Sequence, residues 1–110
     1  MTDELPLLKG TLDLLILKAL SIEPTHGYGV ATWLEARSNG SLGVDDSALY
    51  QSLRRLEARG LVRGEWGVSE NNRRARFYQL TRKGEVELRA QSETWSRYAS
   101  SVANILSVRS

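Results

Sequence analysis

The spacing of the apolar residues changes at Gly60, and no other feature of the sequence limits the fold as much. Before Gly60, apolar residues recur at the i, i+4 and i+7 positions of an amphipathic helix, predicted over residues 47–59. After it, apolar and polar residues alternate as in a strand over residues 62–68. A second β-patterned run predicts a return strand over residues 73–81, and the asparagine-rich segment 69–72 is typical of a hairpin turn. The middle of the chain is therefore expected to fold as a helix followed directly by a β-hairpin.

Two further helices are expected before this unit. Apolar residues on almost every side predict a helix from about residue 7 to residue 21, and such a helix is usually buried on more than one side. Pro24 interrupts this pattern, and a second helix follows over residues 27–37. Asp45 or Asp46 is a suitable N-cap for the third helix. Three helices and a hairpin in this order describe a winged helix-turn-helix.

The last segment has the spacing of a helix that packs against another helix. Thr81 is expected to cap a helix that runs from about Arg82 into the C-terminal residues. A heptad-like seam of apolar residues follows it, formed by Leu88, Trp95, Tyr98, Val102 and Ile105. We therefore expect a mainly α fold with a small β-hairpin (α+β), in which residues 1–81 form a winged helix domain and residues 82–110 a C-terminal dimerisation helix.

Positive charge is concentrated in the middle of the chain. The 110 residues carry 15 Lys and Arg against 13 Asp and Glu, a formal net charge of +2. Residues 50–83 contain nine basic residues against three glutamates, a net charge of +6, whereas residues 1–49 have a net charge of −4. A solvated basic surface would have the same composition, but this uneven placement favours a polyanionic partner.

The composition also argues against several classes of function. The chain has no Cys and one His, which excludes disulfides and thiolate sites and disfavours imidazole catalysis and metal sensing. No pair of carboxylates has an acid/base arrangement. The longest aliphatic run, residues 14–17, is far shorter than the ~20 residues of a membrane span, and the acidic N-terminus is unlike a signal peptide. We expect a cytoplasmic protein without a metal or cofactor that is not an enzyme.

The third helix and the hairpin together predict an interface for duplex DNA. The helix face opposite the leucines is polar and cationic without carboxylates, as required of a helix that enters the ~12 Å major groove. The candidate contacts on this helix are Ser47, Tyr50, Gln51, Arg54 and Arg55. The hairpin is the wing of the winged helix. Its candidate contacts, expected at phosphates or the minor groove, are Asn71, Asn72, Arg73, Arg74 and Arg76. Further candidates for the DNA backbone are Lys9, Tyr28 and Lys83. Tyr50, on the flank, could reach the DNA backbone or pack beneath the wing.

Several segments of the chain resemble the PadR family of bacterial transcriptional regulators. They are residues 8–17, 26–29, 49–62 and 73–84. Together they cover about residues 7–88 in the order expected for the family, and the single C-terminal helix resembles the smaller of its two size classes. Gln51 departs from the family, which commonly has proline after the tyrosine, so the sequence preference is expected to differ here.

The resemblance implies a homodimeric repressor of a dyad-symmetric operator, which a small hydrophobic or aromatic effector releases from DNA. In the family the C-terminal helix packs against its counterpart and against the N-terminal helix of the partner. The dimer interface implied for this chain consists of Leu8, Leu12, Leu15, Leu88, Trp95, Tyr98, Val102 and Ile105. Trp95 is placed like a tryptophan that flanks the effector pocket of some multidrug-sensing relatives, although packing in the seam without a ligand is the alternative.

Two alternatives to the binding of duplex DNA stay open. Winged helices also serve as protein-interaction modules without specific DNA binding, but the polar residues Ser47, Gln51 and Arg54 argue against a third helix packed on another protein. The second alternative is RNA binding. Proteins that read single-stranded RNA usually display exposed aromatic residues on which the bases stack, and the basic region has few of them.

Three residues are interpreted as structural. His26 is expected to hydrogen-bond to the backbone at the start of the second helix rather than to act in catalysis or metal binding. Trp33 and Trp66 are expected in the core.

Overall fold

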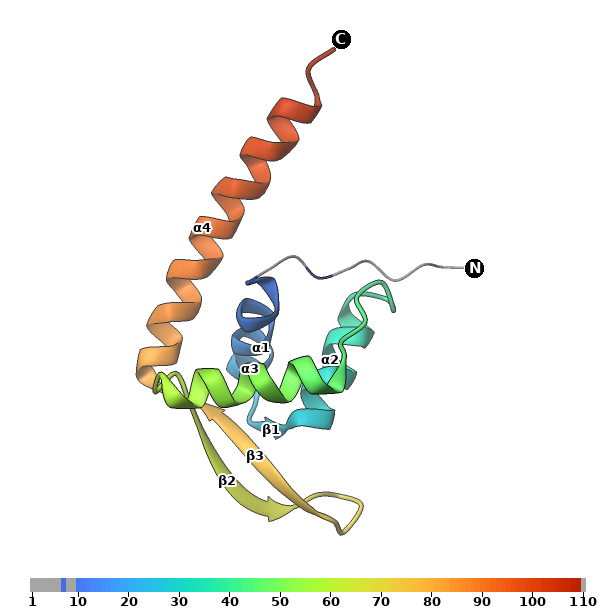
Figure 1. Ribbon diagram of the computed structural model, residues 1–110, viewed down its shortest axis with the longest axis vertical. Coiled ribbons are helices and arrows are strands. Elements are labelled where there is room, and N and C mark those ends of the chain that lie inside the picture. Colours follow the sequence, from blue (N-terminus) through green and yellow to red (C-terminus); the bar gives the residue numbers. More distant parts are fainter. Residues whose placement is uncertain (1–6, 8–9, 110) are drawn as a thin grey trace.

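The computed structural model describes Leu7 and residues 10–109, in which the elements follow the expected order (Figure 1). They are α1 (Thr11–Ile22), β1 (Thr25–His26), α2 (Gly27–Arg37), α3 (Asp46–Ala58), β2 (Val62–Val68), β3 (Arg74–Leu80) and α4 (Arg82–Leu106). The predicted fold class is confirmed, because the helices and the small antiparallel sheet form a winged helix of the α+β class.

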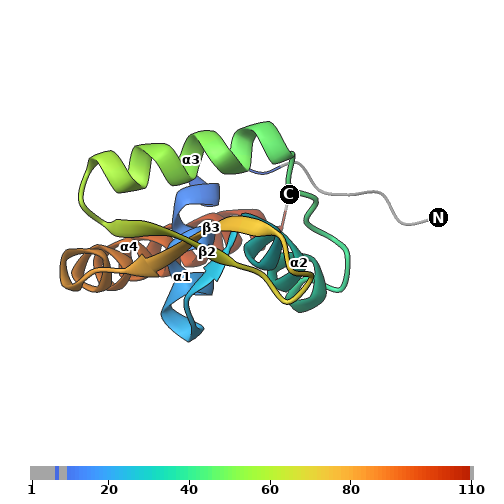
Figure 2. The same ribbon diagram turned by 90° about the horizontal axis from the view of Figure 1, so that it is seen from below.

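Helix α1 lies at the centre of the core. It packs against α2, α3, α4 and β3. In Figure 2, α3 runs along the upper side of the molecule, above the strands. The fully buried large side chains are Ile16, Leu17, Val30, Leu49, Leu53, Leu56 and Leu61. Burial of each such side chain contributes roughly 1.5–3 kcal/mol. Because α1 is apolar on most of its sides, it can contact all four elements at once, as its sequence predicted.

The start of α1 differs from the prediction. Gly10 has φ +86°, a left-handed conformation that a right-handed helix cannot include, and α1 therefore begins at Thr11 rather than near Leu7. Leu8 and Lys9 lie outside the described residues, so their assigned roles in the dimer interface and on the DNA backbone stay predictions.

The predicted helix caps of α3 and α4 are confirmed. Of the two candidates for α3, Asp45 is the N-cap, because its Oδ2 accepts a hydrogen bond from the Ala48 N–H at 3.1 Å. The Thr81 Oγ1 accepts from the Gly84 N–H at 3.0 Å at the start of α4. Each cap satisfies an N–H group that the helix itself leaves without a partner.

The sheet has one strand more than predicted. The hairpin of β2 and β3 is confirmed, but β1 adds a short third strand, with the order β1-β3-β2. Thr25 pairs with Tyr78, and His26 pairs with Phe77. A two-residue strand is too short to produce an alternating pattern, and here the proline-containing break keeps the chain extended long enough to pair with β3. This strand ties the start of α2 to the wing.

Helix α4 extends away from the rest of the fold (Figure 1). Leu88, near its start, packs partly buried against the core. Further along, large apolar side chains are exposed to solvent, namely Trp95, Tyr98, Val102, Ile105 and Leu106. Although α4 has 25 residues, neither it nor any other described helix is apolar enough over a sufficient length to cross a membrane.

Candidate nucleic-acid interface

A groove of about 800 Å³ lies between α3, the wing and the start of α2. Four arginines contribute to its lining: Arg54, Arg73, Arg74 and Arg76. Four aromatic residues line it as well: Tyr28, Tyr50, Trp66 and Tyr78. The expectation that the basic region displays few exposed aromatic residues is wrong, because Tyr28, Tyr50 and Trp66 are exposed beside the arginines. The groove thus combines residues from α3 and from the wing, the two elements that the sequence predicted to act together.

The outer face of α3 is polar and exposed, as predicted. Ser47, Gln51 and Arg54 are exposed, and the Gln51 Nε2 donates to the Ser47 Oγ at 3.4 Å. Arg54 lines the groove and forms no ion pair with an acidic residue in the described part of the chain. Its guanidinium donors are therefore available to an external acceptor.

Arg55 is placed differently from Arg54. Its Nη2 donates to the Asp13 carboxylate on α1 at 2.8 Å and to the Ser52 Oγ at 3.0 Å. Its side chain is not part of the groove lining. The DNA contact assigned to Arg55 stays a prediction, and its observed role is to join α3 to α1.

Tyr50 lies in the groove, packed against the start of α2. A Cβ atom at Gly27 would approach the Tyr50 ring to 2.8 Å, so the glycine leaves room for the ring. Tyr28, on the same side, is 71% exposed. The two tyrosines thus form the α2 side of the groove.

The interpretation of Trp66 as a core residue is wrong, whereas Trp33 packs partly buried against the core. Trp66 is 58% exposed and faces the groove. It shares a face of the hairpin with the buried Tyr78, because side chains alternate along β2 and β3. Near the outer end of the wing, however, this face is no longer covered by α3. The alternation along the strand predicts which face of the hairpin Trp66 occupies, but it does not predict how far along the hairpin α3 covers that face.

Arg76 is held by α3. Its Nη2 donates to the Glu57 Oε2 at 2.7 Å, and the same oxygen accepts from the Gly64 N–H at 3.2 Å. The hydrogen bond to Glu57 raises the pKa of the Arg76 guanidinium above its ordinary value. Burial likewise raises the pKa of the Tyr78 hydroxyl. Glu57 therefore links α3 to both strands of the wing, and Arg76 already has a carboxylate partner within the protein.

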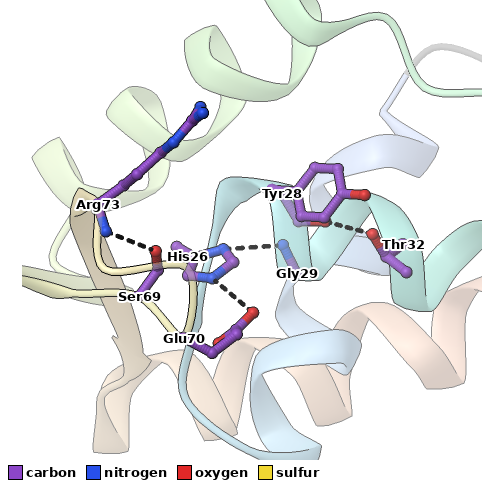
Figure 3. A network of polar contacts seen from close by, with 7 residues as sticks. All are labelled: His26, Tyr28, Gly29, Thr32, Ser69, Glu70 and Arg73. Carbon is purple, nitrogen blue, oxygen red and sulfur yellow. Dashed lines mark hydrogen bonds and ion pairs between the residues drawn. The ribbon is translucent and has the colours of Figure 1, made fainter.

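The wing turn lies close to the start of α2 (Figure 3). His26 Nδ1 accepts from the Gly29 N–H at 3.0 Å, which confirms the interpretation of His26 as a helix-start residue. Its Nε2 lies 3.8 Å from the Glu70 Oε1 in the turn. The Ser69 Oγ accepts from the Arg73 N–H at 3.4 Å, while the Arg73 side chain extends away from His26. These contacts place the turn beside α2 and leave the arginine side chain extended.

The remaining candidates on the wing and on α4 lie at the surface. Asn71 and Asn72 are exposed in the turn, where Asn72 adopts φ +60°. The Lys83 Nζ donates to the Arg59 carbonyl at 3.0 Å, at the end of α3. Lys83 is thus joined to the end of α3, and the DNA contacts assigned to all three residues stay predictions.

A comparison with known families agrees with this geometry. The family model "Transcriptional regulator PadR-like family" matches residues 16–90 of the chain, including α2, α3 and the whole wing. The chain belongs to the PadR-like family. The family resemblance predicted from the sequence is therefore confirmed.

Solved structures of PadR-like regulators have the same fold. A PadR family regulator from Eggerthella lenta is 29% identical, covering 92% of this chain and 86% of its own, with a TM-score of 0.76. A PadR-like regulator from Bacillus cereus is 27% identical, covering 92% and 96%, with a TM-score of 0.77. Bacillus subtilis PadR, solved in complex with operator DNA, is 21% identical, covering 74% and 46%, with a TM-score of 0.66, and shares the fold.

A second hollow of the PadR-like chain lies between α1 and α4 and has a volume of about 650 Å³. Its lining includes Leu14, Trp95 and Tyr98, and the two aromatic ring centroids are 6.1 Å apart. Trp95 is 39% exposed. Leu12 and Leu15, assigned to the dimer interface, are partly buried against the core of their own chain. The exposed apolar surface of the predicted interface is therefore contributed mainly by α4.

Within the described residues, no three His, Asp or Glu side chains are grouped to hold a metal ion.

Proposed function

We propose that this PadR-like regulator is a homodimeric repressor that binds a dyad-symmetric operator in duplex DNA. The observation that carries the proposal is the groove in which Arg54 of α3 and Arg73 and Arg74 of the wing come together. The structure of Bacillus subtilis PadR in complex with operator DNA gives it further support. The carboxylate-free outer face of α3 disfavours the alternative of a protein-interaction module.

The two sides of the groove have different tasks in this proposal. Helix α3 enters the major groove, where Arg54 can donate two hydrogen bonds to a guanine and Gln51 can pair with an adenine. Ser47, one turn before Gln51, would contact a base edge or a phosphate. Arg73 and Arg74 on the wing bind phosphates, which contributes affinity without sequence preference.

Helix α4 supplies the dimer interface. Its exposed apolar side chains form a seam at heptad-like spacing, and burial against a second copy of the chain would remove this surface from water. Pairing about a twofold axis would present two copies of α3 to the DNA, about one helical turn (~34–36 Å) apart. The twofold axis gives the operator its dyad symmetry, and the separation sets the spacing of the two half-sites.

The proposed effector site lies beside the same interface. The hollow between α1 and α4 has a volume of about 650 Å³, within the range of small-molecule pockets, and offers the ring of Trp95. A small hydrophobic or aromatic compound would fit the chemistry of this lining. The alternative is that Trp95 packs in the seam without a ligand. Adding such compounds to the complex with operator DNA distinguishes the two, because only an effector would release the DNA.

Operator recognition is tested by fluorescence anisotropy with the duplex upstream of the gene and with a scrambled duplex, over a series of salt concentrations. We expect a preference for the upstream duplex of about 10³-fold or more, as for other specific readers. Equal, salt-dependent binding to both duplexes would contradict recognition of that site. Absence of binding to either duplex at low salt would favour the protein-interaction module.

Dimerisation is tested by light scattering at micromolar concentration, where we expect twice the mass of the chain. Ile105→Asp places a charge in the seam and is expected to shift the protein towards the monomer, because burial of an unpaired carboxylate is costly. Ser100→Asp introduces the same charge at an exposed position of α4 away from the seam, and is expected to leave the dimer intact. A native protein that scatters as a monomer would contradict the proposed dimer.

A further inference from the structure

Trp66 is a large aromatic side chain that the fold leaves 58% exposed in the groove. Two cationic groups lie beside its ring. The guanidinium carbon of Arg74 lies 4.7 Å from the centroid of the Trp66 ring, and that of Arg76 lies 5.8 Å from it. Both distances fall within the ~6 Å range of cation–π attraction. The indole therefore interacts with guanidinium groups, and its exposed position argues against a role in the core.

The two arginines beside Trp66 differ in what else they bind. Arg76 donates to Glu57 at 2.7 Å, so its charge is compensated within the protein. Arg74 is exposed and forms no ion pair with an acidic residue in the described part of the chain. Of the two, Arg74 is the group whose donors an external anion can occupy.

We propose that Trp66 is a positioning residue for phosphate binding, which holds the Arg74 guanidinium in the groove where one phosphate of the DNA backbone binds. Arg74 rather than Arg76 then supplies the charge at this point of the wing. This inference rests on the proposed DNA binding and names how the wing achieves it.

The chemistry of the arginine side chain allows both contacts at once. A guanidinium can lie with its face on an aromatic ring while its N–H donors point outwards in its own plane. Those donors match the two oxygens of a phosphate. A long, exposed arginine samples many rotamers, and each one excluded before binding reduces the conformational entropy lost on binding. Trp66 thus favours the bound orientation of Arg74 without touching the DNA itself.

The test measures the affinity for one duplex by fluorescence anisotropy over a salt series in a set of variants. We expect Trp66→Leu to weaken binding by about two- to fivefold, the loss that corresponds to an exposed cation–π contact. Trp66→Phe retains an aromatic face and is expected to keep most of the wild-type affinity. If Trp66 served only in apolar packing, the Phe variant would not need to bind better than the Leu variant. Arg74→Ala is expected to lower the salt slope by about one unit, as for a single phosphate contact.

The double variant Trp66→Leu/Arg74→Ala decides between positioning and direct contact. If Trp66 acts through Arg74, the double variant binds like Arg74→Ala alone. An equal loss from Trp66→Leu in both backgrounds would overturn the inference, because the indole would then contact the DNA directly. Native affinity in Trp66→Leu would overturn it as well, while leaving the proposed function intact. If the wild-type protein binds no duplex, both the proposed function and this inference fail.

Discussion

Arg54→Ala is expected to weaken binding to the operator by about 1–3 kcal/mol, or roughly 5- to 150-fold. Arg54 is exposed on the outer face of α3 and lines the groove, whereas Arg55 on the same helix is paired with Asp13. Loss of a base contact reduces affinity for the correct sequence more than for others. Anisotropy titrations with the operator and a scrambled duplex should therefore show a smaller preference in the variant.

Arg63→Ala is the matched control for this prediction. Arg63 is exposed on β2 but alternates to the face opposite that of Trp66, so its loss removes the same charge outside the groove. We expect it to change operator and scrambled binding by the same small factor. If both variants lose the same affinity for the operator and retain the same preference, Arg54 contributes only general positive charge and reads no base.

Gly84→Ala is expected to destabilise the protein by about 3 kcal/mol, at the upper end of the usual cost of overpacking. Gly84 is buried in the first turn of α4, where a Cβ atom would overlap the carbonyl oxygen of Leu61 and approach the Leu80 side chain to 2.8 Å. The expected sign is opposite to helix propensity, which favours Ala over Gly by about 1 kcal/mol. Urea denaturation followed by circular dichroism measures the change.

Ser92→Ala serves as the control within the same helix. Ser92 is exposed, so this substitution changes helix propensity without introducing an overlap, and its effect should stay within about 0.5 kcal/mol. A Gly84→Ala variant as stable as the wild-type protein would mean that α4 does not pack closely against the segment before β2.

The sequence predicts this fold well where side chains repeat over several turns or along a strand. The helix predicted over residues 47–59 is α3 (Asp46–Ala58), within one residue at each end, and the bounds of β2 agree with the prediction. Strand β1 is missed because two residues form no period, and its existence depends on pairing with a strand about fifty residues later along the chain.

The site is harder to predict, because the partners of its charged groups are distant in sequence. Arg55 and Asp13 are 42 residues apart, and Arg76 and Glu57 are 19 residues apart. No local pattern distinguishes these two arginines from Arg54 and Arg74, which line the groove without an ion pair among the described residues. The sequence identifies the basic face, while the packing determines which of its charges remain available.

The two bonds accepted by Glu57 have a mechanical consequence. One carboxylate oxygen joins α3 to β2 through the Gly64 N–H and to β3 through Arg76, so a single side chain connects the helix to both strands of the wing. An effector acting on the proposed dimer would then change the orientation of this unit rather than its internal shape. In a dimer, a tilt of one unit against the other would change the phase of the two units along the double helix. A mismatch of about five base pairs, half a turn, would place the second unit on the opposite side of the duplex.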